Sequence, residues 1–234
     1  MRGHVFGLKG RSMRFEKTGL NRRQFLGLGV AAGLSAGAIG VGVASRAGGT
    51  PLLAAAPDML GDPLPDGAGK LISAARTQIG VTMLYDGAYK KLTYPGGDVP
   101  RVRGVCTDVI VRAYRDGLGV DLQQLVHEDM AQDFSAYPAR WGLKKPDRNI
   151  DHRRVPNLRA FFARQGSEVR DGTVMPGDLI TQNIFNRPHI VIVSNVKSNW
   201  GQRHLVIHNA GGGTEYDDWV ERWPRTGHYR FLVS

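Results

Sequence analysis

The chain has 234 residues, of which 31 are Lys or Arg, 21 are Asp or Glu, and one is Cys. Residues 1–56 hold eight of the basic residues and one acidic residue, so the rest of the chain carries 23 basic against 20 acidic residues. This near balance does not indicate a nucleic-acid-binding protein, although it suits either an anionic wall surface or an ordinary soluble domain. A single cysteine excludes an internal disulfide.

The first 56 residues are typical of an export signal. Five basic residues lie within positions 2–17, an uncharged stretch runs from Gln24 to Ser45, and small residues follow. The segment NRRQFLG at 21–27 resembles the twin-arginine signal and differs from it at both ends. We therefore expect residues 1–56 to bring the chain through the twin-arginine translocase to the periplasm or another extracytoplasmic space.

A membrane anchor is the alternative for this segment, because the uncharged stretch could cross a hydrocarbon core of roughly 30 Å. Six glycines between Phe25 and Ser45 weaken that alternative. Each glycine lowers helix propensity by about 1 kcal/mol relative to alanine. Pro57 follows the best Ala-x-Ala site, so the sequence leaves open whether the signal is cleaved or retained as an anchor.

Residues 57–69 contain three prolines and three glycines and are predicted to form a linker. A single domain is expected at 70–234, which is long enough to bury a core. Its first element is a helix predicted over 70–80, where apolar residues recur at helical spacing and a glycine ends the pattern. The turn-rich segment 92–104 then leads to Cys106.

A second helix is predicted to begin at Cys106. The apolar residues that follow it form one face of an amphipathic helix, namely Val109, Ile110, Ala113, Tyr114 and Leu118. Cys106 could be a small buried hydrophobic residue at the start of this face. It could also be a nucleophile, because a helix N-terminus stabilises a thiolate and lowers the cysteine pKa.

Residues 121–150 mix a short helical pattern with proline-containing and aromatic loops, and 155–166 is predicted to be a helix. The segment VHEDM includes His127 and Asp129, for which we favour a solvated acidic turn or a wall of the substrate cleft over a metal site. The segment DHRR includes His152 and Arg153. Its arginines could bind substrate carboxylates, or they could form an internal ion-pair corner.

Short apolar runs follow and predict an antiparallel sheet; they lie at 177–182, 189–195, 204–210 and 228–234. Asp178, at the start of the first run, is expected to cap or brace a turn before the strand. Helices followed by strands indicate an α+β domain, with the Cys106 helix packed on the sheet.

Two histidines can be placed by assuming that 189–195 and 204–208 form a hairpin. A turn centred between Ser198 and Asn199 pairs residues whose numbers sum to 397, so His189 would face His208. Directly opposed residues point to the same side, with Cβ atoms roughly 4.5–5.5 Å apart. A slip of one residue would put Asn209 opposite His189 instead.

This combination of residues suggests nucleophilic catalysis. Cys106 would attack a carbonyl carbon, and His189 would act as general base and then as general acid. His208 would orient His189, with Asn209 as the alternative third residue. Backbone N–H groups at the start of the Cys106 helix would stabilise the oxyanion.

Several segments resemble the NlpC/p60-type cell-wall cysteine peptidases, a papain-like superfamily; these are TYPGGD, GVCTDV, MPGDLI, PHIVIV and LVIHNA. Longer segments resemble more closely a bacterial family called domain of unknown function 1287; these are GVCTDVIVRAYR, VHEDM, NIDHRRVPNL, PHIVIVS, HNAGGG and GHYR. The likeness covers about residues 68–234.

The resemblance implies a papain-like NlpC-type fold and cleavage of peptide stems in peptidoglycan. It implies Cys106, His189 and His208 as the catalytic set, and Tyr94 as the tyrosine whose hydroxyl lies near the nucleophile. Thr107 and Asp108 replace the usual Ser-Gly, so we assign Asp108 to substrate binding. It also marks 121–155 as an insertion beyond the minimal fold.

We therefore predict an exported, monomeric thiol hydrolase that acts on peptidoglycan or related wall peptides without a metal or other cofactor. The predicted substrate-binding residues are Asp108, His127, Asp129, His152, Arg153 and Asn209. An acyltransferase of the same superfamily is equally compatible with the sequence. The alternatives of another class are a non-catalytic wall-binding protein and a metal-dependent hydrolase that uses His127, Asp129 and His152.

Overall fold

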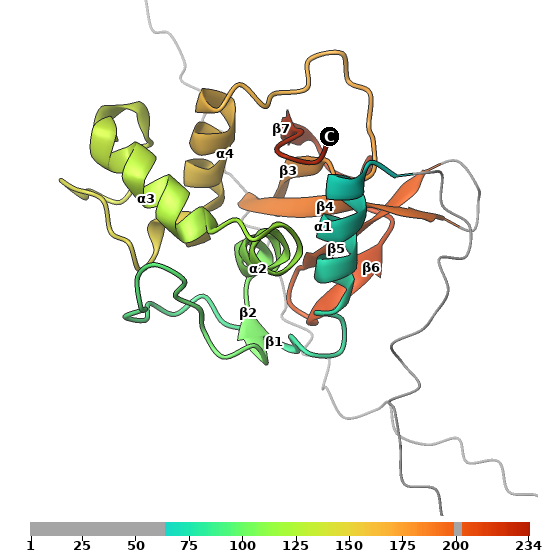
Figure 1. The fold of residues 1–234 in the computed structure, drawn as a ribbon, viewed down its shortest axis with the longest axis horizontal. Coiled ribbons are helices and arrows are strands. Elements are labelled where there is room, and N and C mark those ends of the chain that lie inside the picture. Colours follow the sequence, from blue (N-terminus) through green and yellow to red (C-terminus); the bar gives the residue numbers. More distant parts are fainter. Residues whose placement is uncertain (1–63, 199–202) are drawn as a thin grey trace, which may run out of the picture. The chain divides into compact units, whose positions relative to one another are not determined.

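The structure is a computed structural model that describes residues 64–198 and 203–234. The predicted export signal at 1–56 and most of the predicted linker lie outside the described residues. Helices pack on a five-stranded antiparallel sheet, which confirms the α+β class (Figure 1). Within the described part of the chain, no helix is both long and apolar enough to span a membrane.

Helix α1 spans Asp66–Arg76 and packs against α2, which spans Cys106–Leu118. α1 begins inside the predicted linker, so its predicted start at residue 70 is wrong. The glycine that suggested a linker permits close packing, since a Cβ at Gly67 would lie 3.0 Å from the backbone of Val233. The helix therefore begins where the chain passes closely over its own C-terminal segment.

The amphipathic helix predicted from Cys106 is confirmed. The residues that define its inward face are buried, including Val109, Ile110 and Tyr114. α2 ends at Gly119, whose φ of 68° is the left-handed conformation that favours glycine. In Figure 1, α1 lies on one side of α2 and the helices α3 and α4 lie on the other.

The segment predicted to be an insertion forms a helical lobe next to α2. It contains α3, the short 3-10 helices η1 and η2, and the first residue of α4; the bounds are Leu122–Gln132, Phe134–Ala136, Asp151–Arg153 and Val155–Arg164. α3 contacts η2, α2 and α4. The helix predicted over 155–166 is thus confirmed in position.

The sheet has the strand order β6-β5-β4-β3-β7. Its strands are β3 Leu179–Ile184, β4 Arg187–Lys197, β5 His204–Asn209, β6 Thr214–Asp217 and β7 Arg225–Tyr229. The first three match predicted runs, β6 was not predicted, and β7 begins and ends earlier than the predicted strand at 228–234. A separate parallel pair joins β1, Leu84–Tyr85, to β2, Arg103–Gly104.

Both faces of the sheet are covered by apolar side chains. Ile190 and Ile192 of β4 belong to the core shared with the helices. The alternating residues Val191 and Val193 belong to a second cluster, against which Trp219 packs. Because successive strand residues point to opposite faces, the run IVIV supplies both cores.

Candidate active site

Cys106 is the first residue of α2 and is 3% exposed. Its sulfur faces the backbone N–H groups of Ile190 and Thr107 and the Tyr85 hydroxyl, all of which act to lower the pKa of the thiol. Ile190 lies near the start of β4, so this part of the strand lies beside the sulfur. The residue before Ile190 is His189. The thiol therefore lies where the start of the helix meets the start of the strand.

The start of α2 is held by a buried ion pair. Asp108 accepts a 2.7 Å hydrogen bond from the Val105 N–H and pairs with Arg153 through bonds of 2.8 and 2.9 Å. Arg153 also donates to the backbone carbonyls of Asp86 and Ala88. Asp108 and Arg153 thus satisfy each other in the internal corner that was the alternative to substrate binding, and Arg153 also lines the cavity beside Cys106.

The two histidines meet, although not in the predicted register. His189 Nε2 and His208 Nδ1 are 2.9 Å apart, with their rings nearly perpendicular. The paired residues are Ile192 with Ile207 and Val193 with Val206, which sum to 399 rather than 397. The even difference keeps both histidines on one face, where they are diagonal neighbours instead of directly opposed.

His208 is held by further groups on its own side of the sheet. It is fully buried, and its Nε2 lies 3.8 Å from the Asp217 carboxylate of β6. The Trp219 ring stacks on it at a centroid distance of 4.5 Å. A proton on Nε2 faces Asp217 most favourably, which leaves His208 Nδ1 to accept from His189 Nε2. The Nδ1 atom of His189 is then the free basic nitrogen.

The thiol and the histidine pair belong to opposite faces of the sheet. Cys106 packs in the core shared with the helices, whereas His189 alternates with Ile190 and shares the face of Val191 and Trp219. Within the described residues, the hydrogen bond of the His189 ring is to His208. Both groups border the start of β4, because the Ile190 N–H faces the sulfur and His189 is the residue before Ile190.

Burial sets the protonation of all three groups. It raises the pKa of Cys106 to about 11 and lowers the pKa of His189 to about 3 and that of His208 to about 4. The expected lowering of the cysteine pKa by the helix N-terminus is therefore wrong. Loss of hydration outweighs the two N–H groups that face the sulfur. At neutral pH the site holds a neutral thiol beside neutral imidazoles.

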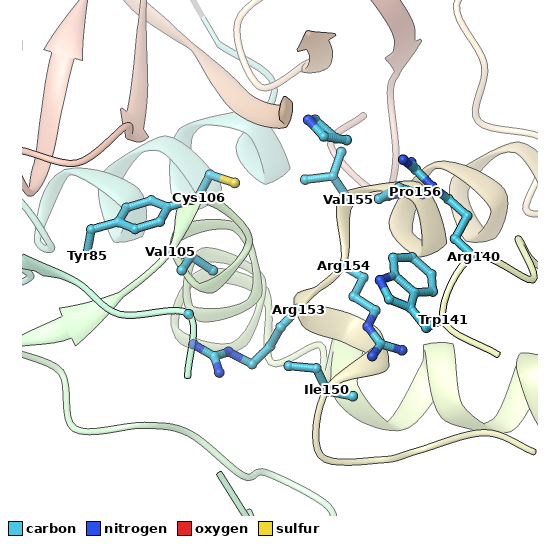
Figure 2. A pocket seen from close by; sticks show the side chains of 12 residues that line it. Tyr85, Val105, Cys106, Arg140, Trp141, Ile150, Arg153, Arg154, Val155 and Pro156 are labelled. Atoms are coloured by element: carbon cyan, nitrogen blue, oxygen red, sulfur yellow. The ribbon is translucent and has the colours of Figure 1, made fainter. Parts of the chain in front are cut away.

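Two cavities open at this place. One of about 410 Å³ is lined by Cys106, Tyr85 and Pro188 on one side. Its other wall comes from 140–156, and Figure 2 shows the sulfur pointing across the gap toward Val155. The second cavity, of about 450 Å³, is lined by His189 and again by Tyr85 and Pro188. Tyr85 and Pro188 therefore form a ridge between a thiol cavity and an imidazole cavity.

The tyrosine beside the thiol is Tyr85 and not Tyr94. Tyr94 packs edge-to-face on His127, with ring centroids 5.1 Å apart, and lies below the guanidinium of Arg148. Tyr85 begins the sequence Tyr-Asp-Gly, and Tyr94 begins Tyr-Pro-Gly. Of the two, only Tyr94 is followed by both glycines of the superfamily's Tyr-x-Gly-Gly pattern, so the motif pointed to Tyr94 and the proximity to Cys106 identifies Tyr85.

The other predicted binding residues lie outside the two cavities. Asp129 binds Arg164 and the Tyr137 hydroxyl, each at 2.6 Å. His152 is 2% exposed, and Asn209 donates to the Gly104 carbonyl at 3.2 Å. His127 lines a third cavity, with Tyr89 and 142–149.

Asp178 accepts a hydrogen bond from the Met175 N–H, which confirms its turn-bracing role. Its carboxylate also binds His228 and Arg230.

The groups proposed for a metal site are not gathered together. Among residues 64–198 and 203–234, no three His, Cys, Asp or Glu side chains are placed to hold a metal ion. Asp129 is instead paired with Arg164, and His152 is buried in η2, which contacts α3, α4 and α2.

Comparison with known proteins identifies relatives of this chain. The family described as "Domain of unknown function (DUF1287)" matches residues 72–231. The uncharacterized protein YijF of Escherichia coli (strain K12) is 49% identical over 170 residues, which cover 70% of this chain and 82% of that protein. The residues matched by the family include the positions of Cys106, His189 and His208 and of both walls of the thiol cavity.

Proposed function

The chain belongs to the family of domain of unknown function DUF1287, and from its site we propose that it is an exported thiol hydrolase of amide bonds. The proposed substrates are the peptide stems of peptidoglycan, and the proposed architecture is that of the NlpC/p60-type papain-like enzymes. A cysteine at a helix start, an antiparallel sheet and a histidine near the start of β4 support this proposal.

One observation carries the proposal. The Ile190 N–H faces the Cys106 sulfur and favours its thiolate form, while the preceding residue of β4, His189, carries an imidazole whose Nε2 lies 2.9 Å from a second histidine. A purely structural cysteine needs neither an oriented imidazole nor a cavity. Here the thiol lines a cavity of about 410 Å³, which lies within the roughly 300–1,000 Å³ range of ligand sites.

The reaction follows from these positions. As substrate fills the two cavities, Nδ1 of His189 takes the thiol proton and the sulfur attacks the carbonyl carbon. The oxyanion is stabilised by the Tyr85 hydroxyl and by the N–H groups at the sulfur. The C–N bond breaks as His189 returns the proton to the leaving amine. Water, deprotonated by His189, then attacks the thioester and releases the acid and the thiol.

The neutral ground state assigns His189 the part of a general base rather than that of a preformed imidazolium. Its lowered pKa keeps the imidazole unprotonated throughout the neutral range. Substrate binding must therefore be coupled to proton transfer, as in serine hydrolases. His208 and Asp217 are positioning residues in this scheme, since they act on His189 rather than on the substrate.

Location and substrate are proposed together. Residues 1–56 would export the chain through the twin-arginine translocase to the periplasm, where wall peptides are present. The signal could remain as an anchor, and the protein would act as a monomer. The peptidoglycan assignment rests on the resemblance of the segments around Cys106, His189 and His208 to the NlpC/p60-type enzymes.

The proposal is tested by incubating purified sacculi with the full chain and measuring released muropeptides. The wild type should release fragments, and Cys106→Ala should release none. Iodoacetamide should abolish the activity and a metal chelator should leave it intact. Equal release by both proteins would overturn the proposal. Binding of sacculi by both without release would identify a non-catalytic wall-binding protein.

A further inference from the structure

The cavity at Cys106 is lined by three arginines and by no carboxylate. Arg140, Arg153 and Arg154 all come from the 140–156 wall. Such a lining favours an anionic group in the substrate, because guanidinium groups bind carboxylates through two parallel hydrogen bonds.

Two of these arginines are already engaged. Arg153 binds Asp108, and Figure 2 shows it running beneath Val105, away from the gap. Arg154 binds Asp151 at 3.1 Å and stacks over Trp141 at 4.2 Å. Arg140 lies at the opposite wall near Pro156 (Figure 2), and within the described residues no carboxylate pairs with it.

The cavity at His189 has a matching feature. It is lined by Arg187, and again no carboxylate lines it. Arg187 opens β4 and is exposed, and no ion pair joins it to another described residue. Each side of the Tyr85–Pro188 ridge therefore carries one arginine whose charge is not compensated.

The chemistry gives the two cavities different parts of the substrate. The acyl group becomes bonded to the sulfur, so it must lie on the Cys106 side of the ridge. The leaving amine takes its proton from His189, so it must lie on the His189 side. The scissile amide then crosses the ridge, with its carbonyl oxygen within reach of the Tyr85 hydroxyl.

We propose that Arg140 and Arg187 bind one substrate carboxylate each, Arg140 on the acyl side of the scissile amide and Arg187 on the amine side. The inference rests on the proposed hydrolase function. The substrate class is then a peptide with an acidic group on both sides of the cleaved bond.

The test uses synthetic peptides in three forms: with both carboxylates, with the acyl-side carboxylate converted to an amide, and with the amine-side carboxylate converted to an amide. KM and kcat are measured for the full chain and for the Arg140→Gln and Arg187→Gln variants. Arg170→Gln is the matched control, since the Arg170 side chain is 88% exposed and lines neither cavity.

Arg140→Gln should raise KM for the fully acidic peptide by about 10-fold to 100-fold, the range of a charge-assisted hydrogen bond. It should leave KM unchanged for the peptide that lacks the acyl-side carboxylate. Arg187→Gln should show the same loss with the amine-side carboxylate. If Arg140→Gln instead weakened binding through the amine-side carboxylate and Arg187→Gln through the acyl-side carboxylate, the assigned direction would be overturned. If each substitution changed KM equally for all three peptides, the carboxylate sites would be overturned.

Binding of the same peptides to Cys106→Ala separates this inference from the proposed function. Suppose that the wild type cleaves no peptide, that Cys106→Ala binds the fully acidic peptide, and that adding Arg140→Gln to Cys106→Ala abolishes this binding. The hydrolase assignment then fails, while the carboxylate sites stand. If cleavage occurs with no effect of either arginine, the sites fail while the function stands.

Discussion

The thiol of Cys106 shows which of two opposing effects controls its protonation. The helix N-terminus and two N–H groups favour the thiolate. Removal from water favours the neutral thiol, and it is the larger effect for a side chain that is 3% exposed. The Tyr85 hydroxyl acts in the same direction as the N–H groups and lowers the pKa of Cys106.

Alkylation by iodoacetamide should therefore rise with pH through the range 7–10 without a plateau near the value of about 8.5 for a free thiol. Tyr85→Phe should lower the rate at each pH, because loss of its hydrogen bond raises the pKa of Cys106 further. Tyr89→Phe, a change to an exposed tyrosine, is the control. A plateau below pH 8 in the wild type would contradict the neutral thiol.

Asp217 selects the tautomer of His208 and, through it, that of His189. Asp217→Asn should lower kcat by roughly 10-fold, equivalent to about 1.4 kcal/mol, with little change in KM. The acid limb of the kcat profile should also move to lower pH, because the carboxylate raises the pKa of His208. The matched control is Asp218→Asn, whose carboxylate instead binds Arg203 at 3.1 Å. Equal effects of the two substitutions would argue against a positioning role.

At the scale of elements, the start of α2 is fixed by groups far away in the sequence. The Asp108–Arg153 pair joins α2 to η2, and Arg153 also holds the backbone near Tyr85. The pair thus sets the distance between the nucleophile, the hydroxyl beside it and the cavity wall. Its contribution is structural, although it lies next to the proposed chemistry.

Arg153→Met should lower the free energy of unfolding by about 3–5 kcal/mol, because it leaves the Asp108 carboxylate buried without its cation. Adding Asp108→Asn should restore part of the loss, since the remaining group is neutral and can still cap Val105. Urea unfolding measures both effects. Arg101→Met, at an exposed pair with Asp116, should cost less than about 1 kcal/mol. Equal losses at the two sites would contradict the buried-pair argument.

The β4–β5 hairpin shows that local sequence patterns predict which face a side chain occupies but not the exact strand register. Its pairing shifts between Val193 and Lys197, so a register counted from an idealised turn differs from the register beside the histidines. The alternation of side chains still placed His189 and His208 on one face. The sequence thus predicted that His189 and His208 meet, but it did not predict that they are diagonal neighbours.

At the scale of the whole molecule, buried neutral histidines make stability depend on pH. Burial lowers the pKa of His152 and His189 to about 3 and that of His208 to about 4, all below the usual value of about 6.5 for histidine. The unfolded chain therefore takes up protons that the folded chain excludes.

The free energy of unfolding should fall as pH decreases from 6.5 toward 4, by up to about 1.4 kcal/mol per pH unit for each histidine. His152→Gln should reduce this slope by the contribution of about one proton, since it removes one histidine that is protonated only in the unfolded chain. Thermal or urea unfolding between pH 7 and pH 4 measures the slope, above the range where carboxylates dominate. A constant stability over this interval would contradict the buried neutral state.

The sequence by itself determined the α+β class, the helix that begins at Cys106, the helix after Val155 and the strands that bear His189 and His208. These follow from hydrophobic periodicity and from turn residues, which act over a few neighbouring positions. Only the tertiary structure decided that Tyr85 contacts the thiol, that Asp108 and Arg153 satisfy each other, and that burial raises the pKa of Cys106. Those properties depend on which distant segments meet and on how much water they exclude, and local spacing contains neither quantity.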